Sequence, residues 1–167
     1  FAYELVATAY RNLVIRRRLH CALRSHFQPG ARLLHTGCGS GQVDRGLSPE
    51  FRITAVDVSL SALRMYQQNN PEAAEVRHAS ALSLPFDDSS FDGVYSLGLL
   101  EHFTAEEIGR ILAEMRRVLK PGGTIVLFWP HAWATSVWFL NRIHWLLNDV
   151  LGKEVRLHPP EISLLRS

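Results

Sequence analysis

The stretch Leu33-Leu34-His35-Thr36-Gly37-Cys38-Gly39-Ser40-Gly41 decides the fold. Apolar residues lead directly into three glycines at alternate positions, which predicts a short strand followed by a tight turn. Glycines without a Cβ also let a ligand come close to the backbone, which suits an adenosine-containing cofactor. A dinucleotide-binding turn would carry its third glycine at position 42, where this chain has Gln42. The spacing therefore favours a different adenosine cofactor over a nicotinamide.

Strand-like runs and helical segments alternate along the chain around this turn. We predict strands at residues 32–36, 52–56, 75–78, 93–97 and 124–129, and helices at residues 1–26, 59–68 and 104–120. Ser59 is a suitable N-cap, and Thr104 with Glu107 has the spacing of a capping box. Right-handed βαβ crossovers convert this alternation into an α/β fold, a Rossmann-like doubly wound, mainly parallel sheet with helices on both faces. Ligands of such sheets bind beyond the carboxyl ends of the strands.

Length and composition point to a single globular domain. Of the 167 residues, 47% are hydrophobic and 20% are charged, and no apolar run approaches the roughly 18 residues of a membrane span. Two cysteines, Cys21 and Cys38, are too few for a disulfide framework and favour a reducing, cytoplasmic location. Residues 1–32 hold six arginines against one glutamate. Because aromatic residues do not interleave with these arginines, a solvated helix face is favoured over nucleic-acid or membrane-surface binding.

Five short motifs follow one another along the chain. They are Gly37-Cys38-Gly39-Ser40-Gly41, Ala55-Val56-Asp57-Val58-Ser59, Leu84-Pro85-Phe86 with Ser90-Phe91-Asp92-Gly93-Val94, Leu100-Glu101-His102, and Arg117-Val118-Leu119-Lys120-Pro121-Gly122-Gly123. Together, over about residues 28–130, they resemble the class I S-adenosylmethionine-dependent methyltransferases, in particular the small-molecule branch that includes ubiquinone-biosynthesis-type enzymes. The resemblance implies a strand order of 3-2-1-4-5, S-adenosyl-L-methionine as cofactor, and methyl transfer to a small-molecule acceptor.

The resemblance also assigns cofactor contacts to residues near the ends of the predicted strands. It implies that the backbone of residues 37–39 approaches the methionine portion and the ribose, that Asp57 holds the ribose hydroxyls, and that Val58 packs on the adenine. Ser80 would contact the adenine amine, and the backbone of residues 96–97 would face the cofactor. The expected cofactor-binding residues are His35, Gly37, Cys38, Gly39, Asp57, Val58, Ser80, Ala81, Ser96 and Leu97.

Two of these residues depart from the family pattern. The family usually has an acid where this chain has His35, and that acid helps to hold the positively charged amino acid end of the cofactor. The family commonly has an aspartate where this chain has Ser80, whose hydroxyl can accept a hydrogen bond but lacks the charge that strengthens it. A degenerate domain that binds cofactor without catalysis, with a regulatory or structural role, is therefore the alternative to an active enzyme.

Catalysis by this mechanism depends mainly on alignment, because the sulfonium leaving group is already activated. A histidine could remove a proton from the acceptor, and we expect His131 first and His102 second in that role, with His144 behind them and no metal. A histidine near a helix start is, however, more often structural. Cys38 lies inside the glycine turn, where a small space-filling residue is favoured over a nucleophile.

Residues 133–151 form a predicted helix with a wide apolar surface that includes Trp133. This surface either shapes a pocket for a hydrophobic acceptor or packs on the sheet, and membrane contact is a minor third reading. We divide the chain into an N-terminal helical cap (1–30), a cofactor-binding core (31–130) and a lid segment on the substrate side (131–167). Because the family sheet ends in an antiparallel hairpin that we cannot place, we expect a C-terminally truncated piece of a longer protein. The sequence leaves the oligomeric state and the acceptor open.

Overall fold

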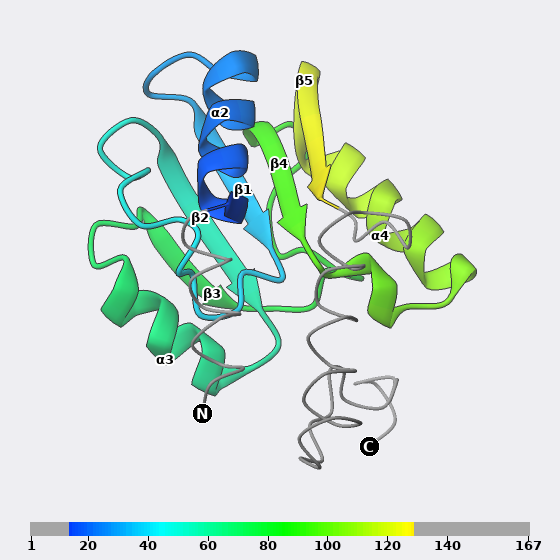
Figure 1. The fold of residues 1–167 in the computed structure, drawn as a ribbon. Helices are drawn as coiled ribbons and strands as arrows, with labels where there is room; N and C mark the ends of the chain where they lie inside the picture. The colour runs from blue at the N-terminus through cyan, green and yellow to red at the C-terminus, as the bar shows by residue number, and fades with distance from the viewer. Residues whose placement is uncertain (1–13, 129–167) are drawn as a thin grey trace, which may run out of the picture.

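The computed structural model describes residues 14–128, and within these residues five strands form one parallel sheet in the order β3-β2-β1-β4-β5 (Figure 1). The strands are β1 (Arg32–Thr36), β2 (Arg52–Asp57), β3 (Glu75–His78), β4 (Phe91–Leu97) and β5 (Leu119–Phe128). All four neighbouring pairs run parallel. The predicted fold class and strand order are therefore confirmed, and β1 lies at the centre of the sheet.

Helices cover both faces of the sheet in the described part of the chain. They are α2 (Arg16–His26), α3 (Leu60–Asn69) and α4 (Ala105–Val118). Successive residues of a strand point to opposite faces, and the core divides accordingly: Leu33 packs with α2, whereas Leu34 packs with α4. Helix α3 shares the face of α2, because Ile53 packs with α2 and Ala55, two residues later, packs with α3. The predicted two-sided arrangement is confirmed, while residues 1–13 of the predicted first helix lie outside the described residues.

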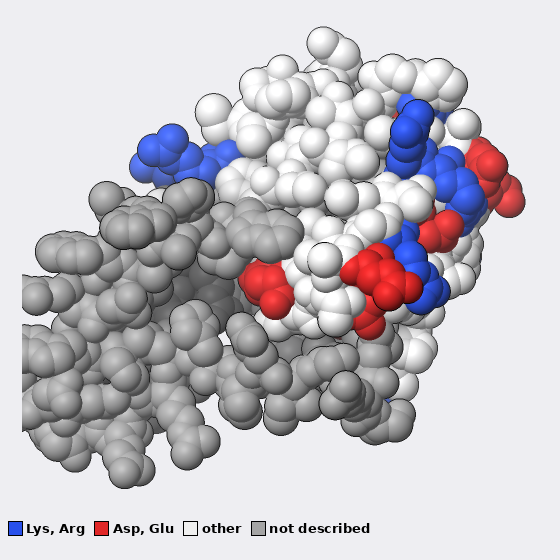
Figure 2. Space-filling view, turned by 90° about the vertical axis from the view of Figure 1, so that its right-hand side faces the viewer, with Lys and Arg blue, Asp and Glu red and all other residues white. Residues whose placement is uncertain are grey.

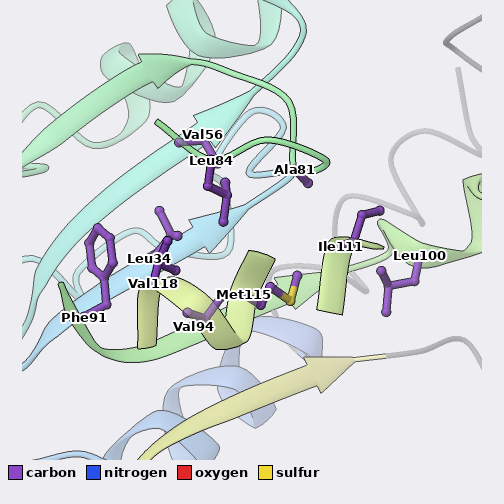
Figure 3. Packing of buried hydrophobic residues seen from close by; sticks show 10 residues of the cluster. All are labelled: Leu34, Val56, Ala81, Leu84, Phe91, Val94, Leu100, Ile111, Met115 and Val118. Carbon is purple, nitrogen blue, oxygen red and sulfur yellow. The ribbon is translucent and has the colours of Figure 1, made fainter. Parts of the chain in front are cut away.

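The face under α4 holds the largest single cluster of buried apolar residues in the described part of the chain. Ile111, Met115 and Val118 are spaced along one side of the helix and are fully buried. Figure 3 shows Met115 and Val118 beside Leu34 and Val94 of the two central strands. Burial of this stripe fixes the position of α4 against the sheet, because apolar area removed from water stabilises by roughly 25 cal/mol per Å².

The ends of α4 show one confirmed prediction and one correction. The capping box is present: Thr104 Oγ1 accepts from Glu107 N at 3.3 Å, and the Glu107 carboxylate accepts from Thr104 N at 2.8 Å. The helix ends at Val118 instead of residue 120, because Leu119 already pairs with Phe91 in the sheet.

Strand β5 begins earlier than predicted, at Leu119 instead of residue 124. Between the pair Phe91–Leu119 and the next pair, Gly93–Thr124, the register shifts, so residues 120–123 form an irregularity. Proline and glycine interrupt regular pairing there, and Gly122 has a φ of 79°. The sequence indicated this interruption correctly but not the pairing that precedes it.

Charged residues are interspersed on the side of the molecule that carries α4, without a field of one sign (Figure 2). Arg117 of α4 contributes to this pattern through ion pairs with Glu114 and Asp88, both at 2.8 Å. Among the described helices, none is long and apolar enough to cross a membrane.

Candidate functional site

The glycine segment, residues 37–41, follows the carboxyl end of β1 and is hydrogen-bonded to the carboxyl end of β2. The amide groups of Gly37 and Cys38 both donate to the carbonyl oxygen of Val56, at 2.9 and 3.0 Å. Gly37, Gly39 and Gly41 have φ values of 67°, 53° and 66°, which L-residues rarely adopt. The alternate glycines form the tight turn that the sequence predicted, and the turn lies against the end of β2.

Asp57, the last residue of β2, faces this segment with both carboxylate oxygens engaged. Its Oδ2 accepts from Gly39 N and its Oδ1 accepts from Ser59 N, each at 2.9 Å. Each oxygen of an ionised carboxylate has two lone pairs, so one acceptor position remains on each. This pair of free positions, on a half-buried and fixed carboxylate, matches the two hydroxyls of a ribose.

Gly39 differs from its two neighbours in the space around it. A Cβ at Gly37 would lie 2.7 Å from Leu99 Cδ1, and a Cβ at Gly41 would lie 2.3 Å from Tyr66 Cδ2, whereas a Cβ at Gly39 would meet no atom of residues 14–128 within 4 Å. Packing against the Tyr66 ring thus requires glycine at position 41, whereas at position 37 the end of the Leu99 side chain would have to move. Gly39 instead borders open space next to Asp57, where a ligand can approach the backbone.

The residues expected around an adenine come together beside Asp57. Val58 is 46% exposed, which leaves an apolar surface available for stacking. His78 donates from Nε2 to the Val58 carbonyl oxygen at 2.8 Å, and Ala79 N donates to Asp57 O at 3.1 Å. These bonds hold the segment that leads to Ser80 against the end of β2. Ser80 Oγ accepts from Leu82 N at 3.2 Å, and Ala81, which follows Ser80, is buried.

Ser96 and Leu97 end β4 next to β1. The Ser96 hydroxyl donates to the Thr36 carbonyl oxygen at 2.8 Å, and the Ser96 side chain is buried. Ser96 therefore locks β4 to β1, and only its backbone is left to face a ligand. The predicted placement of these two residues at the carboxyl edge agrees with the structure.

His35 and Cys38 point to the interior. His35 is 1% exposed, its Nδ1 lies 2.7 Å from Asp44 Oδ2, and its ring stacks on Tyr95 with 4.3 Å between centroids. Burial raises the pKa of the Cys38 thiol well above its ordinary value, and the negative charge of Asp57 raises it further by a smaller amount. A protonated, buried thiol is a poor nucleophile, which supports the space-filling interpretation of Cys38.

Asp44 and Tyr66 were missed by the sequence reasoning, although both lie against the glycine segment. Tyr66 donates from its hydroxyl to Asp44 Oδ2 at 2.6 Å. These residues come from separate elements and belong to no short motif, so no local pattern announces them. The only available signal was an acid, Asp44, three residues after the last glycine of the segment.

Of the three histidines expected as proton acceptors, only His102 lies among the described residues. His102 is exposed, at the end of a 3₁₀ turn (Leu100–His102) that follows β4. In the same turn, Oε2 of Glu101 is buried and finds no hydrogen-bond partner within the part of the chain that the structure describes. His131 and His144 lie outside the described residues.

Comparison with known proteins identifies the family. A family model described as a methyltransferase domain matches residues 34–127. The ubiquinone/menaquinone biosynthesis C-methyltransferase UbiE of Cupriavidus taiwanensis is 30% identical over 161 residues, which is 83% of this chain and 65% of that protein. The 24-methylenesterol C-methyltransferase 2 of Arabidopsis thaliana is 33% identical over 65% of this chain and 31% of that protein.

A solved structure agrees with this match. A crystal structure of a SAM-dependent methyltransferase from Methanosarcina mazei has a TM-score of 0.60 and 27% identity, and the match covers 85% of this chain and 73% of that one. The chain spans between 31% and 65% of the length of the two curated relatives. Since the family model covers more than half of the chain and the strand order is the expected one, the chain belongs to the methyltransferase domain family, among the class I S-adenosylmethionine-dependent methyltransferases.

Proposed function

We propose that this domain binds S-adenosyl-L-methionine at the edge formed by β1, β2 and β4 and transfers its methyl group to a small, hydrophobic acceptor. The observation that carries the proposal is the contact between Asp57 and Gly39. Among the described residues, a carboxylate with two free acceptor positions lies against a backbone segment whose central glycine has no neighbour where a Cβ would point.

The residues at this edge fit the cofactor in their chemistry. Asp57 would hold the ribose hydroxyls, Val58 would stack on the adenine, and the Ser80 hydroxyl would reach the adenine amine. The backbone of residues 37–39 would line the methionine portion, because the glycines there carry no side chain. His35 is buried and is not among the residues that would touch the ligand.

The cofactor supplies a methyl group on a sulfonium, which needs no further activation. The protein's contribution is alignment, and well-oriented partners gain on the order of 7–11 kcal/mol toward the barrier. Asp57 and the glycine segment provide a fixed reference for that alignment, because backbone hydrogen bonds hold both in place. We propose His131, and then His102, as the group that would take a proton from the acceptor.

The choice of a hydrophobic acceptor rests on the relatives and on the sequence. The two relatives are named as a 24-methylenesterol C-methyltransferase and a ubiquinone/menaquinone biosynthesis C-methyltransferase, and residues 133–151 are rich in tryptophan. Both cysteines are free thiols, Cys21 exposed and Cys38 buried, which supports our proposal of a cytoplasmic location.

Calorimetric titration of the full-length protein with S-adenosylmethionine and S-adenosylhomocysteine tests the binding step. We expect binding by the wild type and its loss in Asp57→Ala. Asp92→Ala is the matched control: Asp92 also accepts a backbone N–H, from Arg32 at 2.8 Å, but it lies where β4 begins, away from the carboxyl edge.

Transfer of a labelled methyl group into small-molecule extracts tests the chemical step. Folded wild type that binds neither compound at millimolar concentration would overturn the proposal. Binding without any methyl transfer would favour the alternative, a non-catalytic domain.

A further inference from the structure

A cluster of four buried polar side chains lies against the glycine segment. It consists of His35 of β1, Asp44, Tyr66 of α3 and Tyr95 of β4, and we call it the His35–Asp44 cluster. Asp44 Oδ2 accepts two short hydrogen bonds, from His35 Nδ1 at 2.7 Å and from the Tyr66 hydroxyl at 2.6 Å. Tyr95 stacks on the His35 ring. The Asp44 carboxylate therefore connects β1 with α3, and the stacking of Tyr95 on His35 adds β4 to the cluster.

Burial makes these bonds costly to lose. His35 is 1% exposed, and Asp44, Tyr66 and Tyr95 are 0% exposed. A buried carboxylate needs donors to replace water, and bonds to a charged acceptor are roughly twice as strong as neutral ones. Burial and then the charge of Asp44 raise the pKa of Tyr66, so its phenol stays protonated and keeps donating.

The same cluster fixes the second half of the glycine segment. Asp44 N donates to the Gly41 carbonyl oxygen at 3.1 Å, which ties the backbone of Asp44 to the segment. The Tyr66 ring occupies the space where a Cβ of Gly41 would lie. Asn70 Nδ2 donates to Gly41 O at 2.8 Å, so Gly41 is held by Tyr66 of α3 and by Asn70, the C-cap residue of that helix. Gly39, which donates to Asp57, lies two residues before this anchored point.

We propose that His35 is a positioning residue that acts on cofactor binding through Asp44 and the glycine segment, without touching the cofactor. The His35 ring is 1% exposed, and its Nε2 is buried and has no hydrogen-bond partner among residues 14–128, so the ring presents no exposed atom to a ligand at this edge. This inference rests on the proposed function, because its main readout is the affinity for cofactor.

Two substitutions of His35 separate positioning from contact. In His35→Asn the side-chain amide nitrogen takes the place of Nδ1 and can still donate to Asp44, while nothing replaces Nε2. In His35→Leu the volume is kept and both nitrogens are lost. A positioning role predicts that the Kd for S-adenosylhomocysteine stays within about threefold of wild type in His35→Asn and rises at least about tenfold in His35→Leu.

Tyr66→Phe removes the second donor to Asp44 and should also raise the Kd. Met115→Ala is the control for general destabilisation. Met115 lies on the buried side of α4 and belongs to a different core cluster from Tyr66. The substitution should lower the melting temperature and leave the Kd within about threefold of wild type. All variants are measured as the full-length protein, below their melting temperatures.

Hydrogen exchange at the amides of Gly39 and Gly41 gives a readout that needs no cofactor. We expect faster exchange at both amides in His35→Leu and Tyr66→Phe, and wild-type protection in His35→Asn and Met115→Ala. Equal weakening of binding in the two His35 variants would overturn the inference in favour of direct contact. Unchanged binding and exchange in His35→Leu would overturn it outright, while the proposed function would stand. Wild type that fails to bind, with exchange still responding, would overturn the proposed function instead.

Discussion

Alanine substitutions at Gly39 and Gly41 should separate stability from ligand binding. Both residues have a positive φ, 53° and 66°, so each alanine costs about 1–2 kcal/mol for the left-handed conformation. At Gly41 the new Cβ would also lie 2.3 Å from the Tyr66 ring and 2.5 Å from Asn70 Nδ2, and overpacking of this kind adds about 1–3 kcal/mol. We therefore expect a loss of about 2–5 kcal/mol in Gly41→Ala, against about 1–2 kcal/mol in Gly39→Ala.

Gly39→Ala should lose more affinity for the cofactor than Gly41→Ala, because the new Cβ at position 39 enters the space beside Asp57 that we assign to the ligand. Urea unfolding gives the free energies, and calorimetric titration with S-adenosylhomocysteine gives the Kd of each folded variant. A native stability of about 5–15 kcal/mol leaves room for both measurements. Equal destabilisation of the two variants would refute the contact argument, and wild-type affinity in Gly39→Ala would refute the placement of the ligand.

Three further changes test the scaffold. Met115→Ala should cost about 2–5 kcal/mol in urea unfolding, because it leaves a cavity between α4 and the sheet. Thr104→Ala should cost about 1 kcal/mol by removing an N-cap acceptor, and Thr104→Ser should restore most of it. The hydrogen bond from Arg117, opposed by partial burial, lowers the pKa of Glu114 from its ordinary 4.5. Its stabilising effect is therefore present above about pH 4.5 and is lost as the pH falls through the lowered folded value. Glu114→Gln should reduce stability at pH 7, with a difference from wild type that shrinks below pH 4.5; a difference that grows in acid would contradict the pKa assignment.

Local patterns were sufficient for the parts of the fold that depend on neighbouring residues. The strand at residues 32–36 and the capping box at Thr104 appear as predicted, because alternation, glycine spacing and capping chemistry act within a few residues. The same holds for Asp57, whose place at the end of β2 follows from the length of an apolar run.

Features that depend on distant contacts were not predictable in this way. His35 looked like a residue of the ligand edge, but its partners are nine, 31 and 60 positions away in Asp44, Tyr66 and Tyr95. The start of β5 at Leu119 likewise depends on pairing with Phe91, which overrides the helix pattern that continues to residue 120. Tertiary packing decides such positions, and a single sequence does not reveal it.

The pairing of β1 with β4 also has a consequence for how the protein folds. The hydrogen bond from Ser96 to Thr36 spans 60 residues of sequence, so a long loop must close before the centre of the sheet exists. Contacts of this kind slow folding relative to local ones. During synthesis, the apolar strands β1 and β2 and the glycine segment between them would leave the ribosome well before β4, the strand that pairs with β1. We expect the ability to bind the cofactor to appear late, in the same step in which β4 completes the centre of the sheet. Until then the first half of the domain has exposed apolar strands, so this stage of synthesis is the one most prone to aggregation.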